Sequence, residues 1–259
     1  MIVFDHIGKT AGTTLKFILR NSFGIYHCDV KHAKTNPFTS DELAFARKVF
    51  PDIKCISGHA LVNPVENIKD DDCFFITVLR EPVIRCISNY QDDCLRRAYT
   101  GDLKEWLSDK KTQNLQVKQI AGQENLAKAK ELMDEFSFVG LTERFDESMK
   151  LLKLISPYPL NINYKKKIVA SDNKIKNEIL NNKEKYELVK NHNLLDIELY
   201  RYVKEELFPA RLEERKRELE DIAPPVNMYK NELTLNYQAS IFYNKFIYNS
   251  LVKVLKKSK

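Results

Sequence analysis

Lysine, threonine and glycine residues are concentrated in one short loop near the start of the chain, where their chemistry suits anion binding. An apolar run over residues 2–7 is typical of a buried strand, and the apolar residues at 15–19 have helical spacing. The connection between them contains Lys9, Thr10, Ala11, Gly12, Thr13 and Thr14. In a strand–loop–helix unit, backbone N–H groups and the positive end of the helix dipole converge on one point. This segment therefore predicts an anion site, with a nucleotide phosphate as the favoured ligand.

The order of residues in this loop differs from that of an ATP-binding loop. A Walker A loop ends in Gly-Lys followed by Ser or Thr, whereas here Lys9 and Thr10 come before Gly12, Thr13 and Thr14. The reversed order disfavours a standard ATP site. For this segment taken by itself, the alternative is a glycine-containing turn that binds no ligand.

A second candidate for anion binding follows the apolar run at residues 73–79. Arg80 stands directly after this predicted strand, and Ser88 falls about two helical turns after Arg80, in a helix expected over residues 83–97. Open α/β sheets bind ligands at the carboxyl ends of their strands. A guanidinium fork and a hydroxyl at this edge make a good phosphate clamp. The alternative is that Arg80 forms a structural ion pair with Glu81 or with an aspartate.

Strand and helix patterns alternate along most of the chain. Further strands are predicted at residues 53–57, at 136–141 and, as a last short strand, at 160–164. Helical patterns occupy residues 39–49, 103–109, 113–121, 124–135 and 143–155, the last with Thr142 as its predicted N-cap. This alternation predicts an α/β fold with three layers, α/β/α, around a central parallel sheet.

The C-terminal part of the chain, residues 209–259, is predicted to be a helical extension. Its last segment, residues 230–257, carries a helical stripe of apolar residues and ends in lysines. We expect this stripe to pack on the body or on another subunit, which makes a homo-oligomer plausible. Contact with a membrane surface is the alternative.

Composition excludes several classes of protein. With 259 residues, of which 43% are hydrophobic, the chain can build the core of a large α/β domain. The five cysteines are odd in number and lack C-x-x-C spacing, which indicates reduced thiols and no metal site. No apolar run approaches the ~20 residues of a transmembrane helix, and no signal peptide is present, so a cytoplasmic protein is expected. The lysine runs lack interleaved aromatic residues, so nucleic-acid binding is not expected.

The two candidate motifs together resemble the signature motifs of sulfotransferases that use 3′-phosphoadenosine-5′-phosphosulfate (PAPS). These motifs are HIGKTAGTT at residues 6–14 and VLREPVIRCISNY at residues 78–90. The resemblance is to the branch that contains the heparan and uronyl 2-O-sulfotransferases and many bacterial relatives. Other short motifs agree with it in the expected order: SGH at 57–59, NLQ at 114–116, FVGLTERF at 138–145 and LDIELY at 195–200. The resemblance covers residues 2–208 and implies the P-loop nucleotide-kinase-like fold of these enzymes for a PAPS-binding domain.

The resemblance also implies roles for individual residues. The 5′-phosphosulfate would be held by Lys9, Thr10, Ala11, Gly12, Thr13 and Thr14. Arg80 and Ser88 match the pair that binds the 3′-phosphate, and His59 matches the catalytic base. The alternative for His59 is a structural histidine that caps the end of a strand through backbone hydrogen bonds. The chain departs from the family at Gly8, where proline is common, and at Ser57, where animal members have a second histidine. The second departure puts in doubt the acceptor contact of that histidine.

The expected activity is transfer of a sulfuryl group from PAPS to a hydroxyl of a carbohydrate or glycolipid. His59 would accept the hydroxyl proton as general base, and Lys9 would stabilise the leaving group. The co-product would be 3′-phosphoadenosine-5′-phosphate (PAP), and the chemistry requires no metal. The net charge of +6 weakly favours an anionic acceptor. The alternatives are an ATP-dependent kinase of the P-loop type and a non-catalytic module that binds nucleotide or glycan.

Several polar residues near these motifs have no role that the sequence settles. Asn114 and Gln116 are expected at the border of the cleft, either as ligand contacts or as helix caps. The lysine run at residues 165–167 either closes over the nucleotide or is solvated. His27 and His32 lie in a segment that could face the acceptor.

Overall fold

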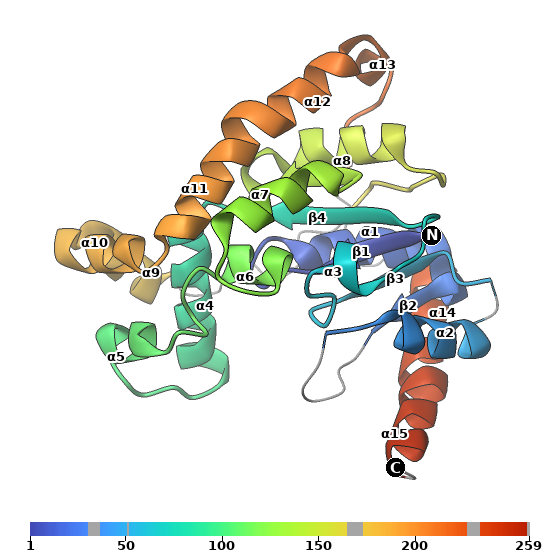
Figure 1. The fold of residues 1–259 in the computed structure, drawn as a ribbon, viewed down its shortest axis with the longest axis horizontal. Helices are drawn as coiled ribbons and strands as arrows, with labels where there is room; N and C mark the ends of the chain where they lie inside the picture. Colours follow the sequence, from blue (N-terminus) through green and yellow to red (C-terminus); the bar gives the residue numbers. More distant parts are fainter. Residues whose placement is uncertain (31–36, 51, 165–172, 227–233, 258–259) are drawn as a thin grey trace.

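A parallel sheet forms the centre of the molecule (Figure 1). The computed structural model describes residues 1–30, 37–50, 52–164, 173–226 and 234–257. Within these residues the strands are β1 (Ile2–Asp5), β2 (His27–Asp29), β3 (Cys55–Gly58), β4 (Phe74–Leu79) and β5 (Phe138–Leu141). All pairings are parallel, in the order β2-β3-β1-β4-β5. The carboxyl ends of the strands therefore meet at one edge, which confirms the predicted α/β class.

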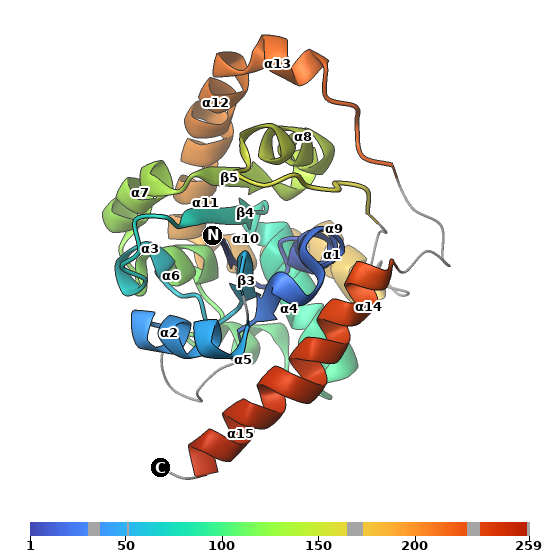
Figure 2. The same cartoon turned by 90° about the vertical axis from the view of Figure 1, so that its right-hand side faces the viewer.

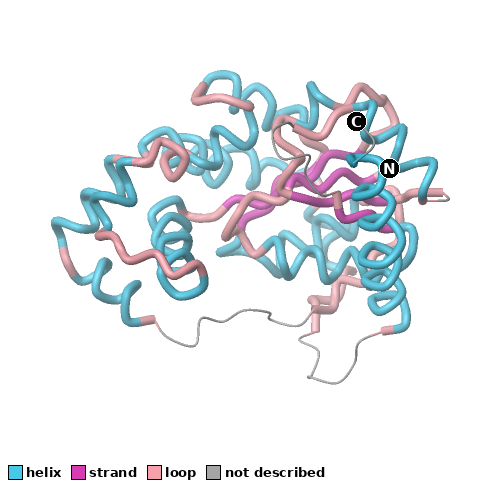
Figure 3. Tube along the Cα trace, turned by 90° about the horizontal axis from the view of Figure 1, so that it is seen from below, coloured by secondary structure: helices cyan, strands magenta, loops and turns pink. Residues whose placement is uncertain are grey.

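Helices flank both faces of this sheet. The first half of the chain contributes α1 (Gly12–Phe23), η1 (Gly24–Tyr26), α2 (Ser40–Val49), α3 (Pro64–Asn67), α4 (Pro82–Arg96), α5 (Leu103–Ser108), α6 (Leu115–Ala121) and α7 (Leu126–Glu135). The second half contributes η2 (Thr142–Arg144), α8 (Phe145–Ile155), α9 (Lys174–Asn181), α10 (Lys183–Asn191), α11 (Leu194–Tyr202), η3 (Val203–Leu207), α12 (Phe208–Glu214) and α13 (Lys216–Glu220). Figure 2 shows α1 and α8 on one face and α6 and α7 on the other, and Figure 3 shows helices around the central strands.

The strands are apolar because both faces of the sheet are covered. Ile2 and Phe4 belong to one buried cluster, whereas Val3 and Ile56 belong to another that includes Leu43 of α2. Successive strand residues point to opposite faces, so a strand buried on both sides needs a continuous apolar run. This requirement explains why the apolar runs at β1 and β4 predict strands from the sequence.

Three local features differ from the sequence-based expectations. β2 was not predicted, because its three residues, His27, Cys28 and Asp29, show no strand pattern. Residues 160–164 do not join the sheet; the backbone N–H of Tyr164 donates instead to Val226 at 3.1 Å. Thr142 is not the N-cap of α8, since its hydroxyl donates to the carbonyl oxygen of Leu79 and ties β5 to the end of β4.

The chain ends in one long helical segment that packs against the body. It comprises α14 (Leu235–Phe242), η4 (Tyr243–Tyr248) and α15 (Asn249–Lys257). Asn244 completes the exposed edge of β2: its Oδ1 accepts the N–H of Asp29, and its Nδ2 donates to the carbonyl of His27, both at 2.7 Å. This side chain thus supplies hydrogen bonds that a further strand would otherwise make. Among the residues described, no helix is long and apolar enough to cross a membrane.

Candidate functional site

The loop between β1 and α1 has the conformation of an anion cradle. Lys9 and Ala11 have φ values of 70° and 61°, in the left-handed region that residues other than glycine seldom occupy. Such turns aim successive N–H groups toward one point, next to the N-terminus of α1. The Thr10 hydroxyl is buried and donates to the Ile7 carbonyl at 3.0 Å, so it stabilises the loop from within. Thr13 is exposed at the first turn of α1, where its side chain can meet a ligand.

Gly12 is required at the start of α1 by the close approach of His6. A Cβ atom at position 12 would lie 1.9 Å from Cδ2 of the His6 ring. His6 is buried and stacks on His59, with ring centroids 4.1 Å apart. Burial lowers the pKa of His6 well below its ordinary value, and His59 lowers it further, so His6 acts as a neutral packing group.

Replacing Gly12 with alanine will destabilise the fold. The new methyl group must displace the His6 ring, and overpacking of this kind costs about 1–3 kcal/mol. Thermal unfolding of Gly12→Ala measures the effect. Gly8→Ala is the matched control, because a Cβ at Gly8 meets no atom within 4 Å. Equal melting temperatures for the two variants would contradict this packing argument.

Arg80 joins the two predicted anion motifs. It follows the last residue of β4, and its Nη1 donates to the Lys9 carbonyl at 3.0 Å. Its Nε is buried and has no hydrogen-bond partner among the described residues. A buried guanidinium donor without a partner costs free energy unless an acceptor occupies the site. Arg80 therefore stabilises the loop through Nη1 and places the positive charge of its guanidinium beside the loop.

Ser88 and Lys9 are related through α4. Lys9 Nζ lies 3.1 Å from Asp92 Oδ1 on this helix. Ser88 precedes Asp92 by four residues, so both side chains lie on the same helix face. The half-buried Ser88 hydroxyl consequently faces the side of α4 that carries Lys9.

Replacing Asp92 with asparagine will increase affinity for an anionic nucleotide. In the structure, Asp92 pairs with Lys9 and also lies 3.3 Å from Arg96, so a phosphate must compete with a carboxylate for Lys9. A pair of this exposure is worth up to about 1 kcal/mol, so Asp92→Asn should bind PAP about twofold to fivefold more tightly. Calorimetric titration measures this. Asp71→Asn removes the same charge from an exposed loop at the opposite edge of the sheet. An equal gain in PAP affinity in that variant would show that the effect comes from net charge alone.

His59 lies at the carboxyl end of β3, in contact with the first loop. Its Nδ1 forms a hydrogen bond with the carbonyl oxygen of His6. A carbonyl only accepts hydrogen bonds, so Nδ1 must carry the proton, and in the neutral ring the lone pair is on Nε2. The His59 side chain is exposed to solvent. This tautomer suits a general base that acts through Nε2.

Gln119 connects His59 to the end of β1 and was missed by the sequence analysis. Its Nε2 donates to Asp5 Oδ1 at 2.7 Å and to the His59 carbonyl at 3.3 Å. Burial raises the pKa of Asp5 well above its ordinary value, although the bond from Gln119 opposes the shift. Gln119 lies three residues after Gln116 on α6, and this shared helix face is the signal that would have found it.

Asn114 and Gln116 hold α6 against the site. The Gln116 side chain bonds both backbone groups of Arg80, accepting its N–H and donating to its carbonyl, each at 3.0 Å. Asp196 accepts the backbone N–H of Gln116 at 3.0 Å, and Asn114 Oδ1 accepts the N–H of Leu195 at 3.1 Å. These contacts show structural roles for both residues. They also join the segment at residues 114–116 to the segment at residues 195–200.

The remaining sequence candidates lie away from the site or outside the described residues. His27 is fully buried, its Nε2 lies 2.9 Å from the Ser57 hydroxyl, and burial lowers its pKa to about 3. Hence His27 is a neutral structural group and not an acceptor contact. His32 and the lysine run at residues 165–167 lie outside the described residues.

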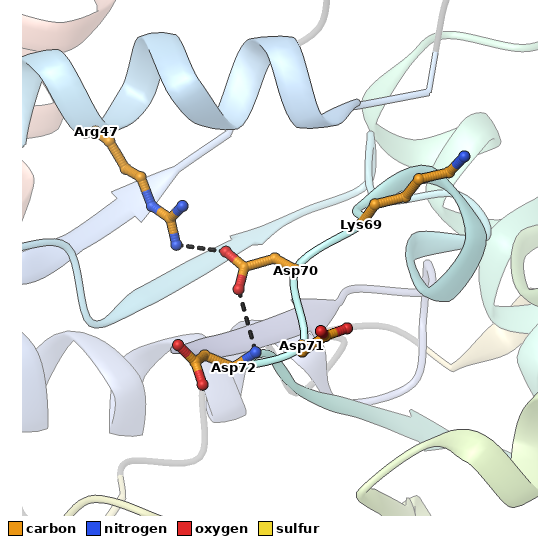
Figure 4. A pocket seen from close by; sticks show the side chains of 5 residues that line it. All are labelled: Arg47, Lys69, Asp70, Asp71 and Asp72. Carbon is orange, nitrogen blue, oxygen red and sulfur yellow. Dashed lines mark hydrogen bonds and ion pairs between the residues drawn. The ribbon is translucent and has the colours of Figure 1, made fainter.

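An open pocket occurs at the opposite edge of the sheet (Figure 4). It is lined by Arg47, Lys69, Asp70, Asp71 and Asp72. Asp70 pairs with Arg47 at 2.5 Å and accepts the N–H of Asp72 at 3.1 Å, so its carboxylate is already satisfied. These residues precede β4, whereas the anion loop follows β1 in a parallel sheet. This pocket is therefore separate from the candidate site.

Comparisons with known proteins assign no family to the chain, so its functional interpretation depends on the geometry of the site. No protein-family model matches the chain, and a search of curated proteins finds no match. Within the described part of the chain, no group of three or more His, Cys, Asp or Glu side chains is placed to hold a metal ion.

Proposed function

We propose that the protein is a PAPS-dependent O-sulfotransferase. The observation that carries this proposal is the hydrogen bond from Arg80 to the Lys9 carbonyl, which holds a half-buried guanidinium beside the loop between β1 and α1. Two anion-binding elements in contact suit a nucleotide with phosphate groups at two positions. His59 lies at the same edge of the sheet and touches the same loop through His6. A base next to a nucleotide cradle is what transfer to a hydroxyl requires.

The residues present would divide the reaction as follows. The acceptor oxygen forms a bond to sulfur while the bond from sulfur to the bridging phosphate oxygen breaks. His59 Nε2 takes the acceptor's hydroxyl proton, and the released PAP carries the negative charge of the leaving oxygen. Lys9 and the loop N–H groups stabilise that charge. Lys9 must leave Asp92 or share its ammonium group with it when the donor binds.

The ATP-dependent kinase is a weaker interpretation of the same site. The loop has the reverse order of a Walker A motif, and Arg80 stands after β4 with a buried donor. A non-catalytic module is also a weaker interpretation, because it gives no role to an exposed imidazole beside the first loop. Carbohydrate is the acceptor class implied by the family resemblance. The net charge of +6 favours an acidic one.

A paired transfer assay tests this function. The protein is incubated with radiolabelled PAPS, or with ATP labelled at the γ-phosphate, and with a panel of polysaccharides, glycolipids and small hydroxyl compounds. We expect label from PAPS in at least one acceptor class together with release of PAP. Transfer of phosphate from ATP, with no transfer from PAPS to any acceptor, would overturn the proposal in favour of the kinase.

A further inference from the structure

The C-terminal helical segment presents two faces of different character. Its inner face, formed by Tyr237, Ser240, Asn244 and Tyr248, is buried on the body. Asn244 bonds the edge of β2, and the Tyr237 ring lies 5.0 Å from that of Phe17 on α1. The inner face thus accounts for how this segment attaches to the domain, and it leaves the outer face without a covering element in the described structure.

The outer face carries large apolar side chains in solvent. Leu235, Phe242 and Phe246 have 83%, 59% and 54% of their surface exposed. The two phenylalanine rings lie side by side, with centroids 5.1 Å apart, and Leu251 of α15 is a further exposed apolar side chain of this segment. Exposed apolar groups that gather on one helix face mark an interaction surface. Figures 1 and 2 both show α15 reaching past the sheet, with its outer side directed away from the body.

The charge of this segment is of one sign. Residues 234–259 contain five lysines and neither aspartate nor glutamate. Lys245 and Lys253 are exposed on the same segment as the apolar side chains, and Lys245 Nζ lies 5.1 Å from the centre of the Phe246 ring. By contrast, the exposed helices α12 and α13 mix both signs of charge in local ion pairs. The C-terminal segment therefore complements an acidic partner.

We propose that the outer face of α14, η4 and α15 binds the surface of a membrane that contains anionic phospholipid. Lysines attract the acidic headgroups, while phenylalanine and leucine side chains enter the boundary between headgroups and acyl chains. A soluble polyanion would satisfy the lysines but would leave the apolar side chains in water. A second copy of this chain would bring like charges together. The segment lies on the bilayer and does not cross it, because its inner face stays packed on the domain.

Vesicle flotation tests the proposal with the full chain. Vesicles of phosphatidylcholine alone are compared with vesicles that also contain phosphatidylglycerol. We expect binding to the anionic vesicles, weakened by salt. Phe242→Ser/Phe246→Ser should reduce it at least about tenfold because two aromatic anchors are lost. Lys245→Gln/Lys253→Gln should reduce it by about 30-fold, at an expected worth near 1 kcal/mol per lysine.

Matched controls separate this face from general surface effects. Leu95→Ser replaces an apolar side chain outside this face with 54% of its surface exposed, and Lys104→Gln/Lys204→Gln removes two exposed lysines elsewhere. Both controls should bind anionic vesicles like the unaltered chain, and all variants should keep its thermal stability. The proposal is overturned by no binding to anionic vesicles, or by binding that the double phenylalanine variant retains. It is equally overturned if the unaltered chain is a dimer that does not bind vesicles and the double phenylalanine variant is a monomer.

Discussion

Replacing His59 with alanine will lower sulfuryl transfer by roughly 100- to 10,000-fold, the usual contribution of a positioned general base. Affinity for PAP should stay within about twofold of the unaltered protein, because His59 contacts the loop through the carbonyl of His6 and leaves the Arg80 contact unchanged. Rates with labelled PAPS, together with calorimetric titration of PAP, measure the two quantities separately.

His192 provides the matched control for this experiment. It also places its Nδ1 against a backbone carbonyl, that of Leu188 at 2.8 Å, but on α10. His192→Ala should leave both transfer and PAP affinity unchanged. Equal transfer rates for His59→Ala and the unaltered protein would remove His59 from the mechanism. An equal loss in both variants would point to general damage to the fold.

Replacing Arg80 with alanine will weaken PAP binding by about 10- to 100-fold, since a hydrogen bond from a charged group is worth about 1.5–3 kcal/mol. Binding of AMP, which lacks the 3′-phosphate, should fall much less. The loss has two sources: the guanidinium charge that would attract the 3′-phosphate, and the bond from Nη1 that holds the Lys9 carbonyl. Titration of PAP and of AMP into Arg80→Ala and into the unaltered protein distinguishes these two sources.

Arg201 offers a comparison at an exposed arginine. It pairs with Glu198 on its own helix, so Arg201→Ala should bind PAP and AMP like the unaltered protein. If Arg80→Ala loses PAP and AMP affinity by the same factor, Arg80 acts only by shaping the loop. In that case it does not read the 3′-phosphate.

The fold was predictable wherever one segment of sequence carried its own pattern. The runs at β1 and β4 are continuous and apolar because both faces of the sheet are covered, and Thr39 and Glu42 form the capping box that opens α2. β2 was not predictable, because a three-residue strand containing His27 and Asp29 owes its place to distant partners. One of those partners, Asn244, lies more than 200 residues away along the chain.

The placement of the candidate residues at strand ends was predictable, but their contacts were not. Two motifs placed Lys9 and Arg80 at the ends of strands, and parallel topology brings such ends together. The pairing of Lys9 with Asp92 was not visible, because the sequence gives no geometry between a loop and a helix joined by a long connection. Gln119 was overlooked because amide side chains on helices usually face water. Its partner Asp5 is buried only in the folded sheet.

The most direct test of the central claim is a comparison of PAP with ADP as ligands of the unaltered protein. The two nucleotides share adenosine and carry two phosphate groups, but only PAP has one at the 3′ position. A ligand at one hundred times its Kd stabilises a protein by about 2.7 kcal/mol, which a thermal-shift measurement resolves readily. We predict that PAP raises the melting temperature and that ADP at the same concentration does not. Stabilisation by ADP with no response to PAP would contradict the sulfotransferase assignment.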